Sequence, residues 1–96
     1  MTGRRTESEE PRLEADFNTL VSMVATQVFI SLGRVPHPIH RGRSIDLNAA
    51  RYHLAMLEVL RTKTRGNLEP DEQKLLDNLC DQLTVGLRQA QAELEE

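Results

Sequence analysis

The stretch KTRGNLEPDE, residues 63–72, decides the fold of this chain. Gly66 follows an amphipathic run, at the position where helices commonly end in a left-handed residue that only glycine adopts without strain. Pro70 fits the first turn of a new helix, because the N–H that proline lacks has no helical partner there. The stretch therefore predicts a tight turn between two helices and not a binding loop. The turn residues are Gly66, Asn67, Leu68 and Pro70.

Apolar residues recur at helical spacing on both sides of this turn. The segment from Asp46 to about Thr64 carries alanine and leucine on one face, and Asp46 is a good N-cap. The segment from Pro70 onward carries a longer apolar stripe: Leu75, Leu76, Leu79, Cys80, Leu83, Leu87, Ala90 and Leu94. Because the connection at 65–69 is short, the two helices must be antiparallel neighbours.

A further helix is predicted ahead of this hairpin, from about Asp16 to Leu32, with Gly33 as its cap. Its main apolar stripe consists of Phe17, Leu20, Val21, Val24, Ala25, Val28 and Leu32. The expected fold class is all-α, with this apolar first helix packed on the antiparallel hairpin of helices two and three.

The expected domain organisation follows from the charge pattern. Residues 1–15 mix both charges with few apolar side chains, which predicts a disordered tail. Residues 16–92 form the helical domain. Residues 93–96 are predicted to fray, because glutamates there oppose the dipole at the carbonyl end of a helix.

Composition excludes several classes of function. The chain has 96 residues, a net charge of −3, no tryptophan and only three aromatic residues, so it has no base-stacking platform for nucleic acid. Cys80 is the only cysteine, which rules out an internal disulfide and a cysteine-rich zinc site. The apolar segment 20–32 is too short to span a bilayer. We expect a cytoplasmic protein without a membrane span.

The chain from Asp16 to about Leu87 resembles the bacterial family known as domain of unknown function 1844. The matching pieces are Asp16-Phe17, Leu32-Gly33, Val35-Pro36, Pro38, Leu47, Ala50, Leu57, Leu60, Lys63-Thr64-Arg65-Gly66-Asn67-Leu68, Glu72, Leu75-Leu76 and Leu79. The chain departs from the family pattern at Ala55, where an acid is usual, and at Thr84, where an arginine is common. The resemblance implies a small helical cytoplasmic protein and carries over no functional residue.

Few residues suggest chemistry. His37 and His40 have a metal-like spacing but no third ligand near them, so loop histidines are the better interpretation. His53 falls on an apolar helix face, as a partly buried histidine bonded to backbone or water. Cys80 lies on the apolar stripe of the third helix, where a buried thiol is expected. We expect no catalytic, cofactor-binding or metal-binding residue, no small-molecule substrate, and no enzymatic activity.

The preferred hypothesis is a non-enzymatic protein-interaction module that self-associates, most simply as a dimer, or docks on a helical protein partner. Beyond its main stripe, the first helix carries a second line at spacings of four, three and four, which a helix-packing seam requires. This candidate interface consists of Thr19, Met23, Thr26 and Ile30. A different face, that of Tyr52, Met56 and Val59, is the other candidate for association.

The alternative is an RNA- or ribosome-associated protein that contacts phosphates through the loop 34–43. That loop contains Arg34, Arg41 and Arg43 and no acid. The acidic remainder of the chain opposes broad nucleic-acid affinity, so nucleic acid is the less favoured partner.

Overall fold

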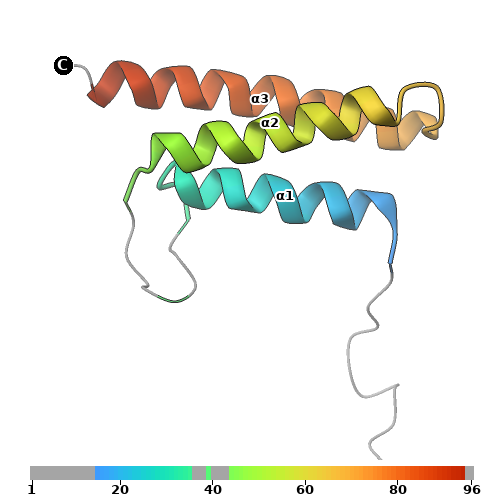
Figure 1. Ribbon diagram of the computed structural model, residues 1–96, viewed down its shortest axis with the longest axis horizontal. Helices are drawn as coiled ribbons and strands as arrows, with labels where there is room; N and C mark the ends of the chain where they lie inside the picture. Colours follow the sequence, from blue (N-terminus) through green and yellow to red (C-terminus); the bar gives the residue numbers. More distant parts are fainter. Residues whose placement is uncertain (1–14, 36–38, 40–43, 95–96) are drawn as a thin grey trace, which may run out of the picture.

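Three helices make up the fold in a computed structural model that describes residues 15–35, 39 and 44–94. They are α1 (Phe17–Ser31), α2 (Leu47–Lys63) and α3 (Pro70–Leu94), and the described residues contain no strand. Figure 1 shows the helices side by side, with α2 running opposite to α1 and α3. The predicted all-α class, with α1 packed on the α2–α3 hairpin, is confirmed.

The turn between α2 and α3 has the predicted geometry. Gly66 has a φ of 85°, in the left-handed region, and the Asn67 N–H donates to the Thr64 carbonyl at 2.9 Å. Glu72 accepts a hydrogen bond from the Glu69 N–H at 2.8 Å, which is one half of a capping box just ahead of Pro70. Leu68 packs against the core, so the turn is held from inside as well.

The start and end of α1 are also capped. The Asp16 carboxylate accepts from the Thr19 N–H at 2.8 Å, and hydrogen bonds from Thr19 hold the pKa of Asp16 below its usual value. Gly33, at a φ of 75°, ends the helix as predicted. The Asp46 N–H donates to the Ser31 carbonyl at 2.7 Å, which joins the end of α1 to the start of α2.

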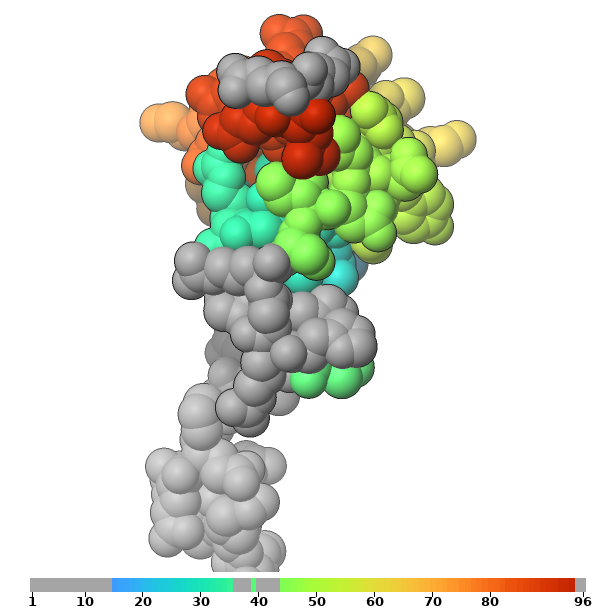
Figure 2. All heavy atoms as spheres, turned by 90° about the vertical axis from the view of Figure 1, so that its left-hand side faces the viewer, coloured from blue at the N-terminus to red at the C-terminus, as the bar shows by residue number. Residues whose placement is uncertain are grey.

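The core lies where the three helices meet. Its largest fully buried side chains are Val21, Val28, Leu57, Leu76, Cys80 and Leu83. Small side chains are buried among them, including Ala25 and Ser31 on α1 and Ala50 on α2, so the helices can approach closely. In the end-on view of Figure 2, the C-terminal part of α3 lies above the end of α1 and the start of α2.

The apolar stripe of α1 differs from the prediction at one position. The sequence places Leu20 in the packed stripe, but Leu20 is 45% exposed, while Ala25 and Ser31 are buried. The buried side of α1 is therefore centred on Val21, Ala25 and Val28, and Leu20 turns toward the surface.

Close packing explains why residue 86, in the interior of α3, is a glycine, and the sequence does not show this. It is buried in the middle of α3, and a Cβ placed there would lie 3.3 Å from both Leu32 Cδ1 and Arg34 Nη2. The segment that leaves α1 thus crosses α3 at its glycine. Within the described ranges, no helix combines the length and the apolar character of a membrane span.

Candidate interaction surface

The exposed side of α1 carries no charge. None of its fifteen residues is Asp, Glu, Lys or Arg, although 28% of the whole chain is charged. Its exposed side chains are Thr19, Leu20, Ser22, Met23, Thr26 and Gln27. The exposed side of a helix in a small protein normally carries charged residues, so the exposed side of α1 is unusual in composition.

An apolar groove runs between this side of α1 and the neighbouring side of α2. Its volume is about 440 Å³, and its lining residues are Leu20, Met23, Val24, Thr26, Gln27, Tyr52, His53 and Met56. We call this set the uncharged face, because the described residues around the groove include no Asp, Glu, Lys or Arg. Met23 and Tyr52 are its most exposed members, each at 62%.

The groove includes residues from both surfaces that the sequence analysis gives as alternative interfaces. Met23 and Thr26 belong to the predicted seam of α1, and Tyr52 and Met56 belong to the other candidate face. Because α1 and α2 pack side by side, these residues line one continuous hollow. Ile30 is half-buried in its own chain and adds less surface than the other seam residues.

A second hollow extends the apolar surface toward the start of α1. It has a volume of about 490 Å³ and shares Leu20 and Met23 with the groove. It reaches back to Phe17 and Thr19, and its lining also includes the charged Asp16 at the start of α1. The candidate surface therefore follows the first half of α1 as well as its middle.

His53 is held inside the groove by its own helix. Its Nδ1 lies 2.9 Å from the Ala49 carbonyl oxygen. A carbonyl only accepts, so Nδ1 carries the hydrogen and donates it. The ring stands edge-on to Tyr52, with centroids 5.2 Å apart at 81°. The expectation of a partly buried histidine bonded to backbone or water is confirmed, and His53 and Tyr52 form an aromatic part of the groove lining.

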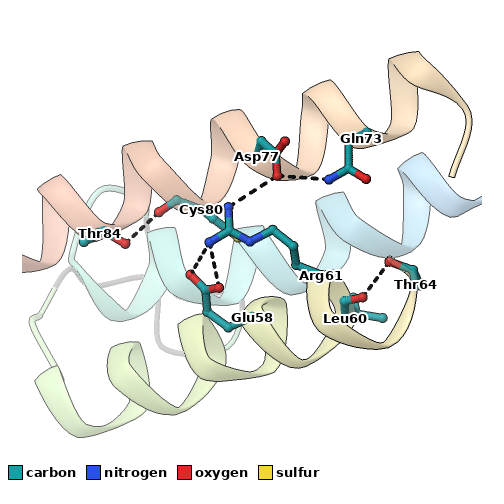
Figure 3. Close-up of polar contacts among 8 residues, drawn as sticks. All are labelled: Glu58, Leu60, Arg61, Thr64, Gln73, Asp77, Cys80 and Thr84. Carbon is teal, nitrogen blue, oxygen red and sulfur yellow. Dashed lines mark hydrogen bonds and ion pairs between the residues drawn. The ribbon is translucent and has the colours of Figure 1, made fainter. Parts of the chain in front are cut away.

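Polar side chains form a different cluster on the other side of α2 (Figure 3). Arg61 contacts both Glu58 carboxylate oxygens, at 2.8 and 3.1 Å, and Asp77 of α3 at 3.3 Å. The hydrogen bond to Glu58 raises the pKa of Arg61, and Gln73 also donates to Asp77 at 3.0 Å. Each charge has a partner, so the cluster ties α2 to α3 and leaves no free acid–base pair.

Cys80 lies behind this cluster as a buried free thiol. Burial raises its pKa from 9.0 to about 11, and the charge of Glu58 adds to the shift while Arg61 opposes it. The reactive thiolate is therefore scarce at neutral pH. This agrees with the expected packing role.

The predicted basic patch is described only at Arg34. Arg34 Nη2 lies 3.4 Å from Gln89 Oε1, and its guanidinium packs over Gly86 of α3. Arg41 and Arg43 lie outside the described residues, as do His37 and His40. Residues 15–35, 39 and 44–94 contain no group of three His, Cys, Asp or Glu side chains that could hold a metal ion.

The family model for the Domain of unknown function (DUF1844) matches residues 14–89. The chain belongs to this family. The match covers α1, α2, the turn and most of α3, and it therefore includes the whole uncharged face. No curated protein and no solved structure matches the chain.

Met23 and Thr26 of the predicted seam line the groove, as do Tyr52 and Met56 of the other candidate face, whereas Val59 does not. The absence of charge along 17–31 is a signal that could have been read directly. The rotation of α1 relative to α2 cannot be predicted from the sequence in this way, because it depends on which small residues lie at the contact between the two helices.

Proposed function

We propose that the protein is a non-enzymatic helical interaction module that self-associates through the uncharged face. One observation carries the proposal: an exposed surface across α1 and α2 has no charged lining residue and contains Met23, Met56 and Tyr52. The cores of protein interfaces are depleted in charge and enriched in methionine and tyrosine.

Association through this face would remove apolar side chains from water. Leu20 and Met56 are 45% and 42% exposed, and Met23 and Tyr52 are more exposed still. Fully burying a large apolar side chain contributes roughly 1.5–3 kcal/mol. A small domain buries a modest fraction of its own surface, so it gains from covering such side chains.

A second copy of the chain is the simplest partner. In a twofold interface the same patch meets itself, so a charged residue close to the axis lies near its own copy, which carries the same charge. An uncharged face avoids that repulsion. We further propose the cytoplasm as the compartment, because the single cysteine is a free buried thiol.

Light scattering on three full-length proteins tests the proposal. The wild type is expected to dimerise at micromolar concentrations. Met23→Glu with Tyr52→Glu places charge in the groove and is expected to give a monomer with unchanged helix content. Val85→Glu is the matched control, since Val85 is 51% exposed on α3 and lies outside the uncharged face.

Two results would count against the proposal. A wild type that stays monomeric at high micromolar concentration removes self-association. A dimer that is lost in Val85→Glu but kept in the Met23→Glu, Tyr52→Glu variant moves the interface to α3.

RNA contact through the loop 34–43 is the second candidate, and its support is the three arginines of that sequence. The described arginine, Arg34, is directed toward Gln89, which leaves it less available for phosphate. Three phosphate contacts would give a log–log salt slope of about −3. RNA binding that survives replacement of Arg34, Arg41 and Arg43 by alanine would exclude this loop as the contact.

A further inference from the structure

The seam of α1 has a spacing that reads the same in both directions. Thr19, Met23, Thr26 and Ile30 are separated by four, three and four residues. If two copies of α1 pack antiparallel, Thr19 lies opposite the partner's Ile30 and Met23 opposite the partner's Thr26. Each level then pairs a large side chain with a smaller one, which lets facing layers interdigitate. Parallel packing would instead place methionine on methionine and threonine on threonine.

Thr26 is suited to such a contact. Its hydroxyl donates to the Ser22 carbonyl at 2.8 Å, so its hydrogen bond is made within α1. Covering Thr26 therefore leaves no donor unsatisfied. Its methyl group remains for contact with a neighbouring side chain. Met23 and Thr26 both line the groove, so an axis between them brings each Met23 to the groove of the other copy.

The charges that flank α1 favour the same orientation. In the sequence, residues 7–16 contain five acids and one arginine, whereas residues 32–45 contain three arginines and no acid. Among the described residues, Asp16 precedes α1 and Arg34 follows it, so antiparallel packing brings the Asp16 end of one copy toward the Arg34 end of the other. Parallel packing places like charges together, which is repulsive. Antiparallel helix dipoles also bring opposite partial charges together.

We propose that the second copy docks with its α1 antiparallel, Met23 against the partner's Thr26 and Thr19 against the partner's Ile30. This inference rests on the proposed self-association and names its geometry. It predicts that Thr19 of the two copies lie far apart, because eleven residues of helix separate Thr19 from Ile30, a rise of about 16 Å.

Disulfide trapping in the full chain tests the geometry, with Cys80→Ala as background. Cysteines bridge only when their Cα atoms lie within about 7 Å. An equimolar mixture of Thr19→Cys and Ile30→Cys chains, one carrying a tag, is expected to give a mixed disulfide dimer under mild oxidation. Neither variant alone is expected to cross-link. The same experiment with Cys80 retained is expected to give the same bands, because Cys80 is buried.

Spin-label distances give a second readout that does not depend on the half-buried Ile30. With one label per chain, antiparallel packing predicts a longer label–label distance at Thr19 than at Thr26. Parallel packing predicts similar distances at both positions.

The outcomes separate the inference from the proposal beneath it. Efficient cross-linking of Thr19→Cys to itself, or equal spin-label distances, overturns the antiparallel arrangement and leaves self-association standing. A dimer with no cross-link in any mixture, and long distances at both labels, places the contact off the seam. A wild type that is monomeric by light scattering removes the proposed function and this inference together.

Discussion

The exposed sides of α1 and α3 differ in their content of charged residues. The exposed side of α3 includes Asp71, Lys74, Asp81, Arg88 and Glu93, so water and counter-charges satisfy it. The exposed side of α1 has no charged residue and includes Leu20 and Met23. Both helices contribute buried side chains to one core. The exposed side of α3 thus presents charged side chains to water along its length, whereas the exposed side of α1 presents only uncharged ones.

The largest change in stability is expected from a comparison of two leucines that lie in the predicted apolar stripes. Leu83 on α3 is 1% exposed, and Leu20 on α1 is 45% exposed. Leu83→Ala is expected to lower the free energy of unfolding by about 2–5 kcal/mol, because it leaves a cavity. Leu20→Ala is expected to cost well under half as much. Urea unfolding at low protein concentration measures both, and equal losses would mean that Leu20 belongs to the core.

The second prediction concerns the buried thiol of α3. The pKa of Cys80 is raised to about 11 in the folded chain, so between pH 9 and pH 11 the unfolded chain loses a proton that the native chain keeps. Stability therefore falls as the pH rises through this window, by on the order of 2 kcal/mol from this group. The measurement is the free energy of unfolding of the wild type and of Cys80→Ala from pH 8 to pH 11. An identical slope in both proteins would contradict the buried neutral thiol.

The third prediction concerns the turn that starts α3. Gly66 has a φ of 85°, and nothing lies within 4 Å of a Cβ built there, so only backbone strain opposes a side chain. Gly66→Val is expected to cost more than about 1 kcal/mol, because β-branched residues resist positive φ. Gly66→Asn is the control and should cost less, since asparagine tolerates this region. Thermal unfolding measures both variants, and an unchanged Tm for Gly66→Val would show that the turn adopts another conformation.

The smallest expected effect compares the ends of the same two helices. The end of α1 is joined to α2 by the hydrogen bond from the Asp46 N–H to the Ser31 carbonyl. The end of α3 carries the exposed Glu93 and Leu94, where negative charge is unfavourable. Amide hydrogen exchange is expected to be slow near Ser31 and fast beyond Ala90. Strong protection of residues 91–94 in the monomer would contradict the predicted fraying.

Much of the fold follows from local rules. Gly33, Gly66, Asp46 and Pro70 each fix a helix boundary through backbone geometry or a cap, and these rules act over a few residues. The antiparallel hairpin then follows from the length of the turn. This is why the sequence predicts the three helices and their order.

Features that depend on contacts between helices are harder to predict from the sequence. From the sequence, Gly86 is expected only to destabilise α3. The structure explains the glycine, because Leu32 and Arg34 pack over it and leave little space for a side chain. Leu20 reads as a core residue, because helical spacing does not say on which residue the buried side is centred. The joining of Met23 to Tyr52 depends on the same rotation of α1 against α2. Sequence periodicity shows which residues share a face of one helix. It does not show how that helix is rotated relative to its neighbour.

The mass of the wild-type chain in solution shows whether two copies associate. Sedimentation equilibrium of the full chain, from low to high micromolar concentration, should show a reversible shift from the monomer mass of 10.9 kDa to twice that value. The shift should vanish when charge replaces Met23 and Tyr52. A monomer at every concentration would mean that the uncharged face does not join two copies of the chain.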